Sequence, residues 1–315
     1  MTSPAEVPAA PGSPELGSPE LGAPPPPDLL LPPARPTLRR PRRLTARPGL
    51  LACAAFLLLV ALMALFPDPF IALLTHDSGR CELIDARVGP SPDHPFGFDT
   101  QGCDYLAQIV RGSRPPLLIG LAVTAGALAL SVLLGLLAGF YGGWVDGLLS
   151  RTTDVFFGLP FLLGATVILV AFPGHGLGAM TLVLVVLGWT TMTRVMRAQV
   201  LEVKDAEYVR AARATGAGPL RLMLRHILPN AVTPVVVVAM LNVGNVISGE
   251  ATLDFLGVGL QYPALSWGLQ LNAAQAYLLD FPHLLLFPAL FLSGTVLSLL
   301  LLGDAVRDAY DPTLR

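Results

Sequence analysis

The sequence predicts an all-α integral membrane protein with six transmembrane helices and with both termini in the cytoplasm. Of its 315 residues, 53% are hydrophobic and only 13% are charged, and the mean hydropathy is +0.63. Soluble domains carry roughly 25% charged residues. A helix needs about 17 to 25 largely apolar residues to cross a hydrocarbon core of ~30 Å. The long apolar runs of this chain are therefore predicted to be membrane spans.

Six apolar runs are long enough to cross the membrane. They are residues 49–66, 117–140, 155–172, 177–193, 231–248 and 283–302. The third and fourth runs are separated only by the residues PGHG, so we expect a tight transmembrane hairpin there. Pro160, Pro234 and Pro288 are predicted to kink their helices, because proline removes a helical hydrogen bond.

The distribution of basic residues predicts the orientation, because Lys and Arg near span ends remain in the cytoplasm. With the N-terminus inside, 16 of the 20 basic residues are cytoplasmic. These are six in residues 35–47, Arg151, seven in residues 194–225, and Arg307 and Arg315; the four outside are Arg80, Arg87, Arg111 and Arg114. The reversed orientation would place 16 of them outside, so both termini are predicted to lie inside.

The ends of the chain differ from its centre. Residues 1–47 are rich in Pro, Ser and Arg and lack apolar periodicity, so we expect a disordered cytoplasmic tail whose basic end lies on anionic membrane lipid. The next apolar run leads into PDPF rather than a small-residue cleavage site, so it is expected to remain as the first span, 48–66. An external segment (67–116), a five-helix core (117–305) and a cytoplasmic C-terminal tail (306–315) follow.

One polar stretch, EYVRAARATGAGPLRLMLRHILPN at 207–230, lies between two apolar runs. Each half repeats residues at the spacing of one helix face. They are Tyr208, Ala211, Ala212 and Thr215 in the first half, and Leu220, Met223, Leu224 and Ile227 in the second. Gly216 supplies a left-handed stop for the first helix, Pro219 suits the start of the second, and Pro229 is predicted to end it. Two short amphipathic helices at an angle are expected.

This pattern of two Ala, three residues, Gly and then HILP (226–229) resembles the EAA loop of binding-protein-dependent ABC importers, a cytoplasmic coupling loop that docks on the ATPase subunits. The resemblance implies that residues 197–229 form this loop. The implied contact residues are Tyr208, Ala211, Ala212, Arg213, Gly216, Leu220, Arg221, Met223, Leu228 and Pro229. Arg210 stands where the motif has Glu, and His226 where it has Ile.

Four further stretches resemble the second permease of peptide-type importers. They are HPFGFDTQGCDYLAQIVRGSRPPLLIGL (94–121), GFYGGWVDGLLSRTTDVFFGLP (139–160), ATLDFLGVGLQYPALSWG (251–268) and LLGDAVRDAYDP (301–312). In the first, Phe98 replaces the usual Thr and Cys103 the usual Arg. The motifs occur in the family's order and cover nearly everything after residue 50. The implied fold is the type I ABC importer permease fold, in a multi-pass protein of the bacterial inner membrane.

The resemblance also implies the function and the partners. The chain is expected to be the permease subunit of an ATP-driven importer of oligopeptides or dipeptides that works by alternating access, with nickel, glutathione or opine-like solutes as alternatives. Its implied partners are a sibling permease in a heterodimer, two ABC ATPase subunits, an external solute-binding protein and membrane lipid, but no nucleic acid. No cofactor is expected on this chain, since ATP and Mg²⁺ belong to the ATPases.

Several kinds of chemistry are disfavoured by the sequence. The only lysine, Lys204, follows LEV and precedes Asp205, so no phosphate-binding loop ends in Lys-Ser or Lys-Thr. The five His residues lack metal-ligand spacing, and no G-x-S-x-G motif occurs, so neither a metal site nor an enzyme is predicted. A secondary transporter is a remote alternative, because the span interiors lack charged residues.

Two sets of polar residues are further candidates. Asn242, Asn245 and Glu250 belong to the fifth span and are candidates for the substrate pathway. Interhelical hydrogen bonding is the alternative for the two asparagines, and a gate or a structural hydrogen bond is expected for the glutamate rather than a proton relay. Cys81 and Cys103 both lie in the external segment, an oxidising compartment, so we expect a disulfide between them.

Overall fold

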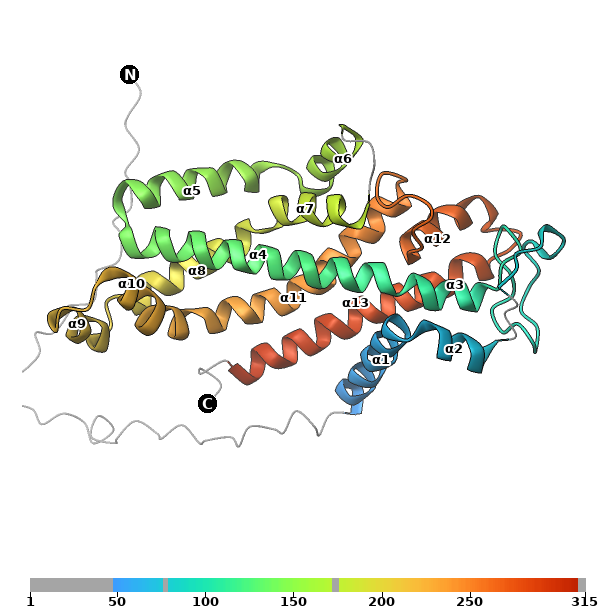
Figure 1. The fold of residues 1–315 in the computed structure, drawn as a ribbon, viewed down its shortest axis with the longest axis horizontal. Coiled ribbons are helices and arrows are strands. Elements are labelled where there is room, and N and C mark those ends of the chain that lie inside the picture. The colour runs from blue at the N-terminus through green and yellow to red at the C-terminus, as the bar shows by residue number, and fades with distance from the viewer. Residues whose placement is uncertain (1–47, 76–78, 172–175, 311–315) are drawn as a thin grey trace, which may run out of the picture. The chain divides into compact units, whose positions relative to one another are not determined.

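Long helices form the framework of the computed structural model, which describes residues 48–75, 79–171 and 176–310 (Figure 1). Within these residues, four helices or continuous runs of helix are long and apolar enough to cross a membrane. They are α1 (Pro48–Leu65), α3 with α4 (Tyr105–Gly112, Arg114–Tyr141), α10 through η4 to α11 (Pro219–Arg221, Leu222–Ile227, Leu228–Phe255) and α13 (His283–Tyr310). The described chain has no β-strand element, so the predicted all-α fold class is confirmed.

Two further spans are bent pairs of helices. α5 (Gly143–Gly158) and α6 (Phe161–Ala171) meet at 84°, and α7 (Leu177–Gly188) and α8 (Thr190–Val203) meet at 45°. Counting each pair as one span gives up to six spans in the described chain. The kink predicted at Pro160 is present as the 84° break, whereas the 45° bend of the fourth span was not predicted.

The first break follows from Pro160, whose ring disfavours the helical conformation of the residue before it. Leu159 accordingly has φ −78° and ψ 124°, outside the helical region. The second break lies at Trp189, next to Gly188. The carbonyl of Trp189 accepts a hydrogen bond from Ser131 Oγ of α4 at 2.8 Å. The first break thus has a local cause, the proline, and the second is accommodated by a hydrogen bond from α4.

Some predicted segments lie outside the described residues. These are the N-terminal tail (1–47), most of the PGHG turn (172–175 are not described) and the end of the C-terminal tail (311–315). On either side of that turn, α6 and α7 pack against each other, as expected of a hairpin.

The second helix of the predicted pair does not end at Pro229, and this prediction is wrong. The helix continues from η4 into α11, and η4 (Leu222–Ile227) is a π-helical turn with bonds from residue i to i+5. The N–H of Leu228 accordingly bonds to the carbonyl of Met223. Asn230 Nδ2 donates to the carbonyl of His226 at 2.7 Å. The widened turn and this side chain accommodate a proline inside a continuous helix.

α4 occupies the centre of the helices and packs against α5, α7, α8 and α11. Its contact with α8 depends on two glycines that bring the backbones close together. A Cβ atom on Gly135 would lie 2.6 Å from Met196 Cβ, and one on Gly139 would lie 2.7 Å from Val200 Cβ. Small residues at helix interfaces in membranes allow such close packing.

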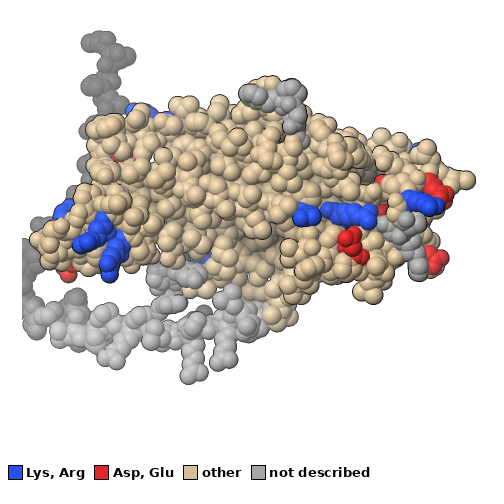
Figure 2. All heavy atoms as spheres, viewed as in Figure 1, with Lys and Arg blue, Asp and Glu red and all other residues tan. Residues whose placement is uncertain are grey.

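Short elements form the two ends of the fold, as Figure 1 shows. α2 (Pro67–Leu74), η3 (Leu83–Asp85), α12 (Trp267–Ala274) and η5 (Gln275–Tyr277) belong to the end predicted to be external, and α9 (Glu207–Ala214) belongs to the other end. In the view of Figure 2, charged side chains gather toward these two ends, and a broad stretch between them carries almost no charge. This pattern fits a hydrocarbon-facing belt.

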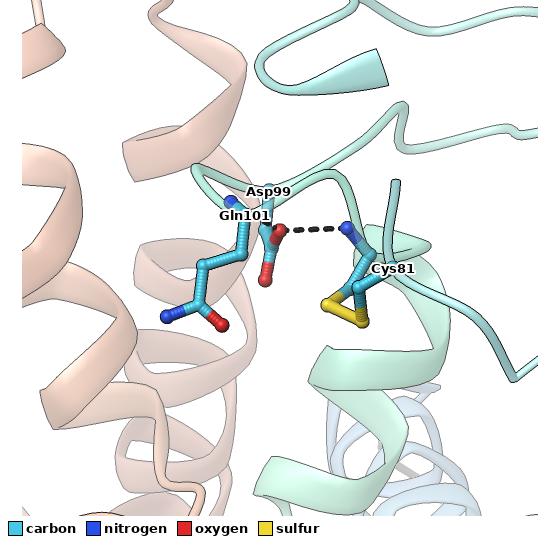
Figure 3. Close-up of a disulfide and its surroundings, with 4 residues drawn as sticks. Cys81, Asp99 and Gln101 are labelled. Carbon is cyan, nitrogen blue, oxygen red and sulfur yellow. Dashed lines mark hydrogen bonds between the residues drawn. A yellow bond between two sulfur atoms is a disulfide. The ribbon is translucent and has the colours of Figure 1, made fainter. Parts of the chain in front are cut away.

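The external segment is closed by a disulfide between Cys81 and Cys103, whose Cα atoms are 4.2 Å apart (Figure 3). Next to it, Asp99 Oδ1 accepts hydrogen bonds from the amides of Gln101 and Cys103, both at 2.8 Å. Burial raises the pKa of the Asp99 carboxyl, although the amides of Cys103, Gln101 and Gly102 act in the opposite direction. The motif FGFDTQGCD is thus a tight, backbone-bonded turn.

Asp104 joins this segment to the helices. Its Oδ1 caps α3 by accepting from the amide of Ala107 at 2.9 Å. Its Oδ2 receives the hydroxyl of Thr75 and lies 2.7 Å from His94 Nδ1. Asp104 is only 3% exposed, and both of its carboxylate oxygens have hydrogen-bond partners, as expected of a buried polar group.

Aromatic contacts attach the external segment to the start of α13 and to the loop before it. The ring of Phe96 stacks on Phe287 with centroids 3.9 Å apart. The guanidinium of Arg87 lies over the rings of Tyr277 and Phe281, 5.1 and 5.5 Å from their centroids. The outer end is therefore a bonded cap rather than a loose loop.

The motif at 251–268 folds around one buried carboxylate, that of Asp254. Its Oδ1 accepts from the amide of Leu260 at 2.6 Å, and its Oδ2 accepts from Ser266 Oγ. A Cβ atom on Gly259 would lie 1.9 Å from Asp254 Oδ1, and one on Gly268 would lie 2.6 Å from Asp254 Cβ. Gly259 and Gly268 are therefore needed for close packing.

We expect Gly268→Ala to destabilise the protein by about 1–3 kcal/mol, because the added methyl overpacks a site bounded by Asp254 and the backbone of Ala251. The matched control is Gly178→Ala in α7, where a Cβ atom meets nothing within 4 Å. Thermal unfolding in detergent, followed by size-exclusion chromatography, should show a lower Tm for the first variant only. Equal Tm values for the two variants would contradict this packing argument.

We expect alkylation of the non-reduced protein to modify Cys53 but neither Cys81 nor Cys103, since the latter two are bonded to each other. Mass spectrometry of the digested protein measures this directly. Closing a loop of this size contributes on the order of 3 kcal/mol in the chain-entropy model, so reduction should also lower Tm. Alkylation of all three cysteines without reductant would show that the bridge is absent.

Candidate functional site

A cavity of about 420 Å³ lies where the two broken spans and α11 meet. Its walls are Phe156, Phe157, Leu159, Pro160 and Phe161 from the first break, Leu187, Gly188, Thr190 and Thr191 from the second, and Asn242, Asn245 and Val246 from α11. Each break places the end of one helix and the start of another beside the cavity. In membranes, interrupted helices are tolerated where they are buried in protein or line a cavity, and transporters bind their solutes at such places.

The polar groups of the cavity are neutral. Two asparagines and two threonines supply amide and hydroxyl groups, and no charged side chain lines it in the described chain. Asn242 Nδ2 is buried without a hydrogen-bond partner among the described residues, whereas Asn245 is exposed. Three phenylalanines supply apolar surface. The cavity therefore suits a solute with both amide-like and apolar parts.

Glu250, the third predicted residue of the substrate pathway, does not line this cavity. It lies in α11 one turn before Asp254, is 0% exposed, and neither of its carboxylate oxygens has a hydrogen-bond partner in the described chain. The structure therefore brings Asn242 and Asn245 together at the cavity and separates Glu250 from them.

The first predicted coupling helix ends as expected. Gly216 has φ +86°, and α9 closes with two hydrogen bonds, from the amide of Ala217 to the carbonyl of Ala212 (3.1 Å) and from Gly216 to Arg213 (3.0 Å). These are the two bonds of a Schellman motif. A Cβ atom at Gly216 would meet nothing within 4 Å, so only the backbone conformation requires glycine here.

The exposed face of the loop differs from the predicted face most clearly at Met223. Leu220 and Tyr208 are 66% and 46% exposed, and Ala211, Arg213 and Arg221 are also exposed. Met223, by contrast, is 6% exposed and belongs to the core shared by α4, α8, α9, η4 and α11. Placing Met223 on the docking face was wrong, because the π turn rotates it inward. Leu224, 52% exposed, takes the outward position.

The remaining predicted loop residues are divided between surface and interior. Pro229 is exposed, Ala212 and Leu228 are half-buried, and the latter two pack against the same core. The exposed set thus consists of small, apolar and basic side chains at the end of the molecule that is predicted to be cytoplasmic. Such a surface can pack against an apolar groove with acidic edges.

Sequence reasoning missed most of the cavity lining. Phe156, Phe157, Thr190 and Thr191 were not singled out, because their role depends on the two breaks lying beside each other. Pro160 was the available signal, since a proline near the middle of an apolar run marks an interruption. The described residues contain no group of three or more His, Cys, Asp and Glu that could hold a metal ion.

A family model described as "Binding-protein-dependent transport system inner membrane component" matches residues 131–315. The dipeptide transport system permease protein DppC of Bacillus subtilis is 36% identical over 276 residues, covering 87% of this chain and 85% of that protein. The oligopeptide transport system permease protein OppC of the same organism is 36% identical over 259 residues, covering 82% and 84%. The glutathione transport system permease protein GsiD of Pectobacterium atrosepticum is 37% identical over 227 residues, covering 72% and 75%.

The arrangement of helices also resembles a solved structure. A chain of the MetNI methionine ABC transporter, in inward-facing conformations, matches with a TM-score of 0.51 and 20% identity. The match covers 64% of the present chain and 94% of the other. At this identity the likeness concerns the fold alone.

Proposed function

The chain belongs to the family of binding-protein-dependent transport system inner membrane components and is a permease subunit of an ABC importer. We propose that its solute is a short peptide. The observation that carries the proposal is the neutral cavity at the two helix breaks, whose amides and hydroxyls can bond peptide groups while its phenylalanines contact side chains. The names of the relatives support the same solute class. A volume of about 420 Å³ is within the range of ~300–1,000 Å³ common for small-molecule sites.

The partners that the family implies would bind at the two ends of the molecule. Of two ATPase subunits, each carrying ATP and Mg²⁺, one would bind the loop around Gly216 of this chain. The other would bind the corresponding loop of a sibling permease. An external solute-binding protein would deliver the peptide at the outer cap. The chain itself catalyses no bond chemistry, and its surroundings are lipid along the uncharged belt (Figure 2).

Transport would proceed by alternating access. Closure of the ATPases on ATP draws the two coupling loops together, and the broken spans convert this movement into opening of the cavity toward the outside. Only contacts that differ between the inward-open and outward-open states can drive the exchange. Exposed loop residues such as Leu220 and Arg221 would make such contacts at the inner end.

The solute can be tested with the complete complex in proteoliposomes. We expect ATP-dependent uptake of radiolabelled dialanine or trialanine, and a reduction of roughly tenfold or more in Asn245→Leu, because an amide that bonds the solute is replaced by an apolar group. Val186→Leu, at an exposed position of α7 outside the cavity, is the matched control. Uptake of glutathione or nickel, with no uptake of either alanine peptide, would overturn the proposed solute.

The coupling loop gives a second prediction. Gly216→Trp should abolish uptake and weaken co-purification of the ATPases, because it combines a left-handed backbone, which costs a residue with a Cβ atom roughly 1–2 kcal/mol, with a bulky group on the docking surface. Gly216→Asn is the matched control, since asparagine tolerates that backbone and is small. Normal uptake and normal ATPase co-purification by the tryptophan variant would show that this loop does not contact the ATPases.

A further inference from the structure

α5 lies between two breaks in the helical path. At its start, Gly142 and Gly143 have φ of +65° and +54°, and a Cβ atom on either would meet nothing within 4 Å. At its end lies the 84° break before α6. Within α5, a fully described helix, Thr153 alone is buried. Apart from Phe156, which packs against two apolar clusters, the helix therefore contributes little to the apolar interior.

Two ion pairs attach α5 to α8 instead. Arg197 Nη2 donates to Asp146 Oδ2 at 2.6 Å, and Arg194 Nη2 donates to Asp154 Oδ1 at 2.8 Å. The later residue of α5 pairs with the earlier residue of α8, so the two helices run antiparallel. The pairs lie in successive turns of α8 and tie both halves of α5 to it.

The space between these helices is a polar hollow of about 420 Å³, not a packed core. Its lining residues are Ala138, Leu149, Ser150, Thr153, Asp154, Thr193, Arg194 and Arg197. Close-packed side chains transmit movement rigidly, and a hollow does not. Movement of α8 can therefore reach this stretch of α5 through the ion pairs.

α8 in turn belongs to the coupling loop. Met196 and Val200 of α8 share one core with Val209 of α9 and with Leu222 and Ile227 of η4. Only residues 204–206 separate α8 from α9. Any displacement of the loop by an ATPase must therefore displace α8.

The other end of this connection is the cavity. The guanidinium of Arg194 lies 4.1 Å from the ring centroid of Phe157, which lines the cavity two residues before the break at Leu159. Phe156, the neighbouring lining residue, meets Trp189 edge-on at the second break. The two ion pairs between α5 and α8, called the tether below, thus lie next to the cavity wall formed by Phe156 and Phe157. This wall would move when the cavity opens or closes.

We propose that the Asp146–Arg197 and Asp154–Arg194 pairs are positioning residues that transmit the movement of the coupling loop to α5 and thereby to the cavity. This inference rests on the proposed function only in requiring ATP-driven movement of the loop. The side chains of Arg194 and Asp154 are 45% and 56% exposed, and exposed pairs contribute little to stability. Those of Arg197 and Asp146 are only 36% and 20% exposed. Removal of either pair should impair transmission, and removal of the exposed Asp154–Arg194 pair should leave folding intact.

The movement can be measured in the assembled complex without knowledge of the solute. Cysteines at Leu148 of α5 and Leu133 of α4, both exposed, would carry spin labels in a Cys53→Ala background. Pulsed electron paramagnetic resonance then gives their separation without nucleotide and after trapping with ATP and vanadate. The variants are Asp146→Asn, Asp154→Asn, and the exchange Asp146→Arg with Arg197→Asp. Arg151→Gln, on α5 but without an ion pair in the described chain, is the matched control.

In the wild type and in Arg151→Gln, we expect trapping to change the separation of the labels. Each neutralised variant should lose this change, and trialanine uptake per ATP hydrolysed should fall about tenfold, a size typical of coupling between distant sites. Tm should be unchanged in Asp154→Asn, whose ion pair is exposed. The charge exchange should restore both readouts. The tether would be overturned if both neutralised variants showed a normal change of separation. It would also be overturned if the exchange variant assembled and hydrolysed ATP but behaved like Asp146→Asn.

The two proposals fail in different ways. If no alanine peptide is transported but trapping still moves α5 in the wild type only, the proposed solute is wrong and the tether stands. If trialanine is transported and α5 moves equally in all variants, the tether is wrong and the solute stands.

Discussion

The need to bond every backbone polar group within hydrocarbon is the constraint on which this structure depends. An unbroken helix satisfies the constraint by itself, whereas an interrupted helix leaves amides and carbonyls that must be sheltered by protein or water. Both interruptions, at Leu159–Pro160 and at Trp189, adjoin one cavity, and the carbonyl of Trp189 is bonded by Ser131 of α4. The continuous helix α11 thus provides a wall of this cavity, and the continuous helix α4 supplies a hydrogen bond at the second break.

The two ends of the molecule meet the same requirement by different means. At the outer end, buried side chains supply the bonds: Asp104 caps α3, Asp254 holds the 251–268 loop, and Trp267 Nε1 donates to the carbonyl of Ile109 at 3.1 Å. At the inner end, backbone geometry does most of this work, through the left-handed Gly216 and the π turn of η4. The outer end is consequently a cross-linked cap, and the inner end leaves its side chains free to form a contact surface.

The interior is divided unequally between these ends. One continuous core joins α4, α8, α9, η4 and α11, and a second lies around α6, α7 and the outer half of α11. α5 lies at the margin of both, contributes only Phe156 to them, and carries two ion pairs to α8. This division would allow α5 to move beside the cavity without unfolding of the core. Ion pairs at a polar surface tolerate rearrangement that close-packed apolar side chains do not.

The sequence by itself determined the fold class, the identity of the membrane-crossing segments, the family, and the two-helix form of the loop with a left-handed Gly216. These features depend on local quantities: the length of apolar runs, the spacing of side chains along a helix, and the conformations open to glycine and proline. Asn242 and Asn245 were recognised as polar residues in an apolar span, but their position at a cavity depended on the breaks of two other spans.

The tertiary structure decided what local spacing cannot express. Met223 and Leu224 are neighbours on the predicted apolar face, yet the π turn buries the first and exposes the second. Pro229 was expected to stop a helix, but Asn230 and the widened turn accommodate it. Glu250 lies in the same helix as the two asparagines but faces a different environment. In each case the outcome depends on which elements pack against the residue, and residues distant in the sequence determine that packing.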